Sequence, residues 1–478
     1  MKKSVFSLMA MAILSQSFAA ELYVSPTGTG DCSSSNPCDI ETALNTASSN
    51  GDNDTIYLKA GTYSVVNLEY APTSQEGSLT IVGETDNETV LDAGEDGRVL
   101  SIDTTQSGND QNVVITVKNL TFTNGYISEP DEKGAGLKIT AEEAHVNIEK
   151  CKFVNNKITG SGDGGGLFVR SEYGSITVKN CLFDNDQVDD YSGGADLSTK
   201  EGNIVLSHSI FKNNSAGYGG GASLSVEAEF DIRVINNVFI NNRALATGNG
   251  RGGGLLIETS AGQAYVVNNT FTGNYSSAYG GGLHIKGFDD NGDIFLYNNI
   301  IYGNTSDNLG NDVYIEAEEG STSYYPSIDI KSNNYSDLYI EHDNDFPEGK
   351  LIKKYNITDH EPDFVSDGDF HLKRNSYLID KGSDSPPFLP DKDIDGEARI
   401  IANHVDIGAD EVSNPELPPD NQQGNNNGSS NGSSNNSSSS GSSGGGGGCS
   451  FSPATSPINA LLYLAMPFIL LSRRFFRG

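Results

Sequence analysis

Three neighbouring segments decide the fold: IRVINNVFINN at residues 232–242, AYVVNNTFTGN at 264–274 and IFLYNNIIYGN at 294–304. In each segment, alternating residues lead into an Asn-Asn pair, an aromatic or apolar marker and a turn that ends in Asn. Alternation with a period of two is typical of a β-strand that buries one face. The segments therefore predict one such strand in every thirty or so residues.

The same pattern recurs over more than 150 residues, and two markers within each repeat recur at the same interval. The marker residue recurs at Phe122, Phe153, Phe183, Phe211, Phe239, Phe271 and Ile301. A glycine-rich turn ending in leucine recurs at Leu137, Leu167, Leu197, Leu224, Leu255 and Leu283. No helix-length apolar pattern separates the strands, which excludes βαβ units. The sequence predicts an all-β, single-stranded parallel β-helix, a solenoid in which each repeat forms one coil.

The position two residues before the marker predicts the interior of the tube. It holds Asn237, Asn269 and Asn299, which would stack as an amide ladder with each side chain bonded to its neighbours. Cys151 and Cys181 occupy the same column in earlier repeats. We interpret them as small buried thiols; a disulfide between coils, a metal site and a nucleophile are the alternatives.

Two further features are assigned to the turns. Asparagines after the marker, such as Asn155-Asn156 and Asn241-Asn242, tolerate left-handed backbone. Glycine runs, such as 252–254, supply positive φ or close approach between coils. No Lys-Ser or Lys-Thr follows a glycine run, so these are not phosphate loops.

Both ends of the solenoid need a cap, because they expose strand edges. Residues 20–51 predict an N-terminal loop and a capping helix over 40–47 with Asp39 as N-cap, and Cys32 and Cys38 predict a local disulfide. Residues 52–340 form coils, and 341–412 form the last coils and a terminal cap. No cofactor is expected except calcium, for which the candidate ligands in 391–395 are Asp391, Asp393 and Asp395. An EF-hand is excluded, because Ala402 stands where its Glu would be.

The chain ends predict export and anchoring. Residues 1–19 read as a secretory signal peptide cleaved after Ala19. Residues 413–448 read as a Ser/Asn/Gly linker. Residues 449–478 combine Cys449, an apolar stretch and an Arg cluster, an order that resembles bacterial C-terminal sorting tails. That resemblance implies tail removal and modification of Cys449 at the cell surface or outer membrane; an uncleaved tail anchor is the alternative.

The glycine-rich turns and Phe-x-Asn-Asn markers together resemble right-handed parallel β-helix proteins of the pectate-lyase-like superfamily. They are also similar to repeats of polymorphic outer-membrane-protein adhesins, over roughly 52–340. Residues 395–411 resemble the end block of choice-of-anchor surface proteins, in which Arg399 would pair with Asp406 or Glu411 as a structural lock. The resemblance implies a right-handed helix and a surface role.

Composition separates the function classes. The formal net charge of −34 argues against nucleic-acid binding, which needs dense Lys and Arg. We favour a monomeric, non-catalytic protein for adhesion to, or binding of, a glycan, matrix or host surface; a polysaccharide lyase or glycoside hydrolase is the alternative. Acidic residues are plentiful, but basic ones are scattered, so no catalytic residue is named. Tyrosines near turns could stack on sugars or cover coil edges: Tyr218, Tyr279, Tyr302, Tyr324 and Tyr325.

Overall fold

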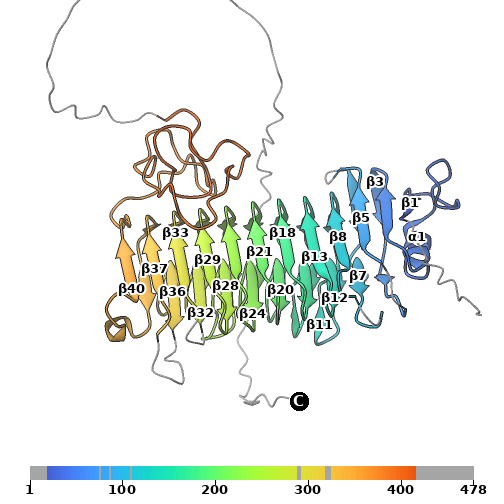
Figure 1. Cartoon of the computed structure of the whole chain (residues 1–478), viewed down its shortest axis with the longest axis horizontal. Coiled ribbons are helices and arrows are strands. Elements are labelled where there is room, and N and C mark those ends of the chain that lie inside the picture. The colour runs from blue at the N-terminus through green and yellow to red at the C-terminus, as the bar shows by residue number, and fades with distance from the viewer. Residues whose placement is uncertain are drawn as a thin grey trace, which may run out of the picture. The chain divides into compact units, whose positions relative to one another are not determined.

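The computed structural model describes residues 19–74, 77–85, 88–107, 110–287, 292–317 and 325–415. Almost all of the expected signal peptide, nearly all of the expected linker, Tyr324 and Cys449 lie outside these ranges. The described chain is a parallel β-helix, which confirms the predicted fold class (Figure 1). Within these ranges, no helix has the length and apolar character required to cross a bilayer.

Three long parallel sheets run the length of the solenoid, and neighbouring strands within a sheet come from successive coils. Sheet I consists of β1 (Ala20–Val24), β2 (Asp54–Leu58), β5 (Leu79–Gly83), β8 (Val114–Lys118), β13 (His145–Glu149), β18 (Ile176–Lys179), β21 (Ile204–Ser207), β25 (Ile232–Ile235), β29 (Ala264–Val267), β33 (Ile294–Tyr297), β37 (Ile328–Lys331) and β40 (Leu351–Lys354). Sheet II consists of β3 (Gly61–Ser64), β6 (Thr89–Asp92), β9 (Thr121–Thr123), β14 (Lys152–Val154), β19 (Leu182–Asp184), β22 (Ile210–Lys212), β26 (Val238–Ile240), β30 (Thr270–Thr272), β34 (Ile300–Ile301) and β38 (Asn334–Tyr335). Sheet III consists of β4 (Leu68–Tyr70), β7 (Leu100–Asp103), β12 (Leu137–Ala141), β17 (Leu167–Ser171), β20 (Ala195–Thr199), β24 (Ala222–Val226), β28 (Leu255–Thr259), β32 (Leu283–Gly287), β36 (Val313–Ala317) and β39 (Leu338–Ile340).

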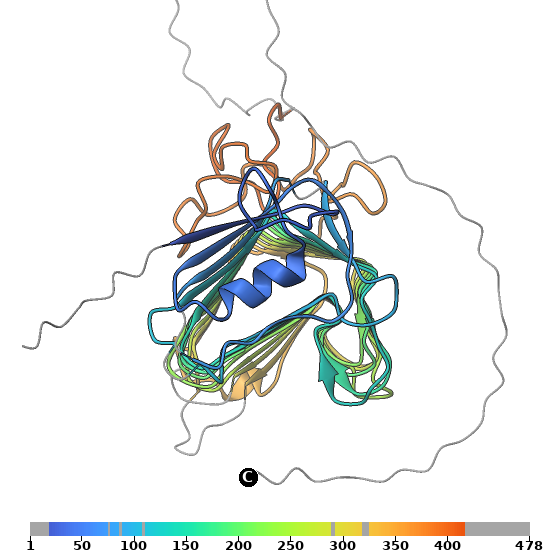
Figure 2. The same ribbon diagram turned by 90° about the vertical axis from the view of Figure 1, so that its right-hand side faces the viewer.

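A fourth layer, which we call the lobe, stands beside sheet III (Figure 2). It is formed where the chain passes from sheet II to sheet III, and its short strands also pair in parallel. They are β10 (Tyr126–Ile127), β11 (Glu132–Lys133), β15 (Lys157–Ile158), β16 (Gly162–Asp163), β23 (Ser215–Ala216), β27 (Arg243–Ala244), β31 (Tyr275–Ser276) and β35 (Thr305–Ser306). The lobe has its own small apolar core, which includes Ile127, Ile158 and Val188.

The core is a stack of equivalent side chains. The six marker phenylalanines lie in one buried column with successive ring centroids 4.4 to 5.1 Å apart. The leucine marker is partly out of register: Ala195 and Ala222 pair with the column of Leu137 and Leu167, and Leu197 lies two residues further along. Because strand side chains alternate with a period of two, this offset still leaves Leu197 facing the core.

The structure places Asn237, Asn269 and Asn299 in a single buried column between sheets I and II. The side-chain amide of Asn237 donates to Oδ1 of Asn269 at 3.1 Å, and that of Asn269 donates to Oδ1 of Asn299 at 3.0 Å. Earlier in this column, Cys151 and Cys181 are buried thiols. Burial raises the pKa of the Cys181 thiol to about 12, so it stays protonated and unreactive.

A second buried ladder fills the turn after sheet II, where the sequence predicted only turn residues. The first Asn of each pair has positive φ, as at Asn155 and Asn241. The second points inward, and its amide donates to the equivalent residue in the next coil. At the end of the ladder Asn304 donates instead to Asp312, which lies later in the same coil. The members of this second ladder are Asn156, Asp186, Asn214, Asn242, Asn274, Asn304 and Asp312.

The N-terminal cap follows the prediction. Helix α1 (Ile40–Ala47) lies across the mouth of the first coil, and Asp39 accepts a hydrogen bond from the Thr42 N–H (Figure 2). Ile40 and Leu44 on its inner face are buried. Cys32 and Cys38 form the predicted disulfide.

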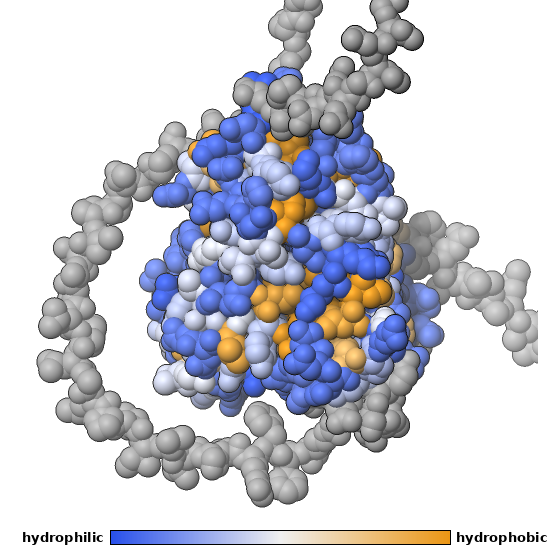
Figure 3. All heavy atoms as spheres, turned by 90° about the vertical axis from the view of Figure 1, so that its left-hand side faces the viewer, coloured by the Kyte–Doolittle hydropathy of each residue, from blue (hydrophilic) through white to orange (hydrophobic). Residues whose placement is uncertain are grey.

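The C-terminal part differs from a simple end cap. Strands β39 and β40 and the 3-10 turn η1 (Asp343–Asp345) complete the last coils. Residues 356–415, which we call the terminal block, lie along the flank of the solenoid above β29 and β33 (Figure 1). At the end of the last coil, apolar side chains reach the surface within a hydrophilic rim (Figure 3).

The terminal block is held to the flank by asparagines in three successive coils. Asn236 Oδ1 accepts from Arg399, Asn268 Nδ2 donates to the Gly408 carbonyl, and Asn298 exchanges two hydrogen bonds with Ser383. Arg399 is buried and donates to the carbonyls of Asp406, Gly408 and Ala409. Its Nε lies 3.8 Å from Glu411 Oε2, so Arg399 joins the block both internally and to the coils.

Candidate functional site

Charged and aromatic side chains gather where the lobe faces the outer surface of sheet III. Each coil contributes one lobe residue to a column that runs Lys133, Asp163, Tyr191 and Tyr218, and then Arg251 and Tyr279. Sheet III contributes two outward columns opposite it. The first includes Asp196, His284 and Tyr314, and the second includes Glu258, Lys286 and Glu316. We call the following residues the charged strip: Lys133, Asp163, Asp190, Asp196, Arg251, Glu258, His284, Lys286 and Glu316.

One half of the charged strip holds three aspartates from two adjacent coils. Lys133 Nζ forms an ion pair with Asp163. Burial, reinforced by the charge of Asp163, raises the pKa of Asp196 to about 7, and Ser192 donates a hydrogen bond to Asp196 at 2.9 Å. Burial, reinforced by Asp163, also raises the pKa of Asp190. A carboxyl with a raised pKa, Asp196, and a carboxyl paired with lysine, Asp163, therefore belong to neighbouring coils of the strip.

The other half is built around Glu316. It accepts from Lys286 Nζ at 2.6 Å and from His284 Nε2 at 3.3 Å, and Arg251 lies 3.5 Å away. Burial opposes ionisation of Glu316, but these hydrogen bonds and charges lower its pKa to about 2. Burial raises the pKa of nearby Glu258.

His284 is fully buried at the floor of this half. Burial lowers its pKa, so the imidazole is neutral at pH 7 and its Nε2–H donates to ionised Glu316. Nδ1 is then an acceptor that has no partner among the described residues, and the same holds for the donor Nε–H of Arg251. The site therefore retains unused hydrogen-bonding capacity beside its ion pairs.

Tyrosines line the strip. Tyr191 and Tyr218 stack with their centroids 4.8 Å apart, and Tyr191 is 37% exposed. Tyr314 packs against both Tyr279 at 4.8 Å and His284 at 4.9 Å. Among the other tyrosines considered from the sequence, Tyr325 is buried against Phe346 and Tyr302 lies beneath the terminal block.

The charged strip was not predicted from the sequence. The sequence suggested that basic residues are scattered, yet Arg251 and Lys286 both contact Glu316. His284, Tyr314 and Glu316 were not singled out. Each coil supplies only one or two of these residues, and the coils differ in length. The available signal was a charged or aromatic residue at the second or fourth position of the sheet III strands, with β24 as the exception.

The predicted calcium ligands do not converge. Asp393 is buried and accepts hydrogen bonds from the backbone N–H groups of Asp395, Glu397 and Glu411. Asp395 instead bonds to His371 at 2.9 Å. Asp391 is exposed. By accepting these backbone hydrogen bonds, Asp393 stabilises the fold of its loop.

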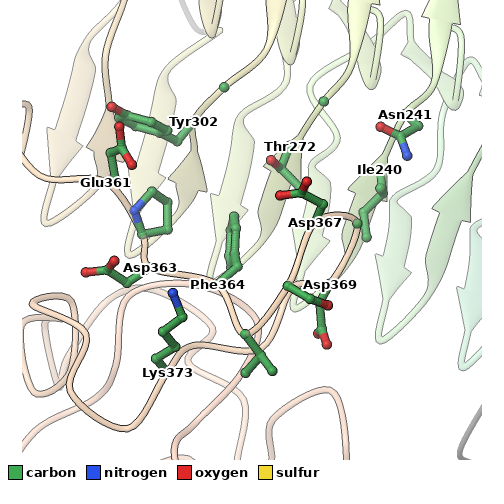
Figure 4. A pocket seen from close by; sticks show the side chains of 16 residues that line it. Ile240, Asn241, Thr272, Tyr302, Glu361, Asp363, Phe364, Asp367, Asp369 and Lys373 are labelled. Carbon is green, nitrogen blue, oxygen red and sulfur yellow. The ribbon is translucent and has the colours of Figure 1, made fainter.

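A separate pocket of about 410 Å³ lies between the terminal block and the turns after sheet II (Figure 4). Tyr302 and Phe364 line its apolar part, and Glu361, Asp363 and Asp367 make it acidic. Its carboxylates would repel an anionic ligand. The charged strip, which combines aromatic faces with both signs of charge, is the stronger candidate for a functional site.

Residues 27–226 match the family model described as rhamnogalacturonase A/epimerase, pectate lyase-like. This match covers the N-terminal part of the parallel β-helix. Similar solved structures include the pectate lyase Pel9A, which is 16% identical with a TM-score of 0.43, covering 83% of this chain and 96% of that one. A rhamnogalacturonan lyase is 15% identical with a TM-score of 0.29, covering 72% and 90%. No curated protein matches the chain.

Proposed function

We propose that the protein binds a polysaccharide along the charged strip. The observation that carries this proposal is the column of lobe residues facing sheet III, in which stacked Tyr191 and Tyr218 continue into Arg251 and Tyr279. Exposed tyrosine rings stack on sugar faces, and carboxylates, Lys and Arg bond to hydroxyl groups. Successive coils are one strand spacing apart, about 4.8 Å, so the strip extends along a chain-like ligand. The match to a pectate-lyase-like family model agrees with this ligand class.

Cleavage of the bound chain is a second candidate, favoured by Asp196 and Asp163. A glycoside hydrolase needs one protonated carboxyl to donate a proton to the glycosidic oxygen and one carboxylate to activate water or attack the sugar. The pKa of about 7 suits Asp196 to the first role, and the ion pair with Lys133 suits Asp163 to the second.

One polysaccharide panel tests both candidates. Replacing Tyr191 by Ala is expected to weaken binding about fivefold, because loss of one stacked ring removes about 1 kcal/mol. The control is Tyr173→Ala. Tyr173 is 45% exposed and follows the carboxyl end of β17, whereas the lobe precedes the amino ends of the sheet III strands. Affinity electrophoresis measures both variants. Equal binding by both variants and the unaltered protein would contradict the proposed location.

The same panel of polysaccharides is also assayed for new reducing ends, which cleavage of the chain would produce. If Asp196 is the acid, Asp196→Asn lowers the rate about 100-fold, and Asp189→Asn, an exposed neighbour, does not. Binding with no release of chain ends by the unaltered protein would exclude hydrolysis and leave the binding proposal intact.

We also propose that the chain is exported and tethered to the cell surface. The signal peptide pattern in residues 1–19 and the tail pattern around Cys449 support this. Mass spectrometry of the cell-associated protein should show an N-terminus at Ala20; an intact Met1 terminus would contradict export.

A further inference from the structure

The terminal block contains a cluster of three metal-ligating side chains outside the charged strip. Ligand atoms of His371, Asp395 and Asp410 all lie within 4.8 Å of one another. The three residues come from separate stretches of the block, and their approach depends on its folding against the coils. A side-chain nitrogen and two carboxylates suit a divalent transition metal.

His371 is oriented from its far side. Asp369 Oδ1 accepts a hydrogen bond from the backbone N–H of His371 at 3.0 Å and lies 2.5 Å from the ring Nδ1. This leaves Nε2 directed at Asp395, 2.9 Å away. A carboxylate behind a histidine in this way fixes the ring and makes the other nitrogen a better ligand.

Asp410 supplies the third ligand atom of the cluster. It is only 8% exposed, and one of its oxygens, Oδ2, accepts from the Leu372 N–H at 3.1 Å. No hydrogen bond from the described residues reaches Oδ1, and this oxygen is not sealed from solvent. It is therefore available to coordinate an ion, and a bound cation would offset the cost of burying the carboxylate.

We propose that His371, Asp395 and Asp410 bind one divalent transition-metal ion, with Zn²⁺ preferred over Ca²⁺. Zn²⁺ accepts mixed nitrogen and oxygen ligands in sets of three or four, whereas Ca²⁺ requires six to eight oxygens. Water completes the coordination, since His371 and Asp395 are partly exposed. Asp369 is a positioning residue. The ion would join three stretches of the terminal block.

The test is Zn²⁺ titration of the full chain after EDTA treatment, followed by calorimetry. The unaltered protein is expected to bind one equivalent, and Asp410→Asn and His371→Gln to bind at least tenfold more weakly. Asp369→Asn should weaken binding about 10- to 100-fold, because it loosens the ring. The matched control is His404→Gln. His404 lies in the same block and forms an exposed pair with Asp384 at 2.7 Å, which this substitution breaks.

Two readouts keep this test decisive if a variant folds poorly. Zinc-edge X-ray absorption of the unaltered protein should show nitrogen and oxygen ligands without sulfur, which also excludes binding by the cysteines. Zn²⁺ should raise the melting temperature of the unaltered protein and of His404→Gln. Sulfur coordination, no bound equivalent, or unchanged affinity in Asp410→Asn would overturn the proposal.

Discussion

Replacing Asn269 by Ala is expected to lower the free energy of unfolding by about 3–5 kcal/mol. Asn269 Oδ1 accepts from both the backbone and side-chain N–H groups of Asn237, and its Nδ2 donates to the Val234 carbonyl at 2.8 Å. The substitution leaves the buried Asn237 backbone N–H without an acceptor, at about 1–3 kcal/mol, and removes one of the hydrogen bonds to the Val234 carbonyl, at about 1 kcal/mol. The lost side-chain volume adds a cavity cost.

Denaturant unfolding followed by circular dichroism measures this loss. The control is Asn45→Ala on the exposed face of α1, which should change stability by less than about 0.5 kcal/mol. A solenoid is stabilised mainly by contacts between adjacent coils, so a damaged coil can also split the transition into two. If Asn269→Ala unfolds together with the control, the ladder does not hold the coils together.

Sequence reasoning found this ladder because its pattern is local. The strand alternation, the Asn-Asn pair and the marker lie within about ten residues of each other, so one repeat displays them all. The second ladder has the same period but was assigned to turns, because Asn tolerates left-handed backbone. Only the first Asn of each pair, such as Asn241, uses that tolerance, while the second, Asn242, points into the core. The two roles cannot be separated without knowing which residue faces inward.

The charged strip and the terminal block were harder to predict for a different reason. Glu316 meets Arg251 across 65 residues, and Arg399 meets Asn236 across 163. Such contacts depend on coil register, and the coil length varies enough that Leu197 lies two residues from Ala195, the position that pairs with Leu167. The block's place on the flank depends on shape complementarity between two folded surfaces. A periodic sequence pattern predicts neither the coil register nor this shape complementarity.

Replacing Asp186 by Asn is expected to stabilise the protein, by about 2–4 kcal/mol at pH 7. Asp186 is the only carboxylic acid between asparagines in the second ladder as described. Its Oδ1 accepts from Asn156, but Oδ2, in the place of the usual Nδ2, has no partner. At the equivalent position, the Nδ2 of a neighbouring asparagine donates hydrogen bonds to an amide oxygen and to a Phe carbonyl, as in Asn214. An acid must hold a proton on Oδ2 to do the same.

The sign of the pH dependence follows from that proton. Burial raises the pKa of Asp186 well above its ordinary value, so the folded state retains a proton that the unfolded state releases above about pH 4. Stability is therefore lost as pH rises, by about 1.4 kcal/mol per unit while the acid stays protonated. Asn supplies the donor at every pH, so the advantage of Asp186→Asn should be small near pH 4 and grow toward pH 7.

Asp312, at the end of the same ladder, provides the matched control. Its Oδ1 accepts from Asn304, and its Oδ2 accepts from the backbone N–H groups of Ser336 and Asp337 and from the Ser336 hydroxyl. An amide nitrogen in that place would face donors, so Asp312→Asn should destabilise by about 1–3 kcal/mol. Opposite signs for one substitution at two rungs would show that hydrogen-bond direction, and not burial of charge alone, sets stability in this ladder. Destabilisation by both variants would mean that Asp186 is ionised and paired in the folded state.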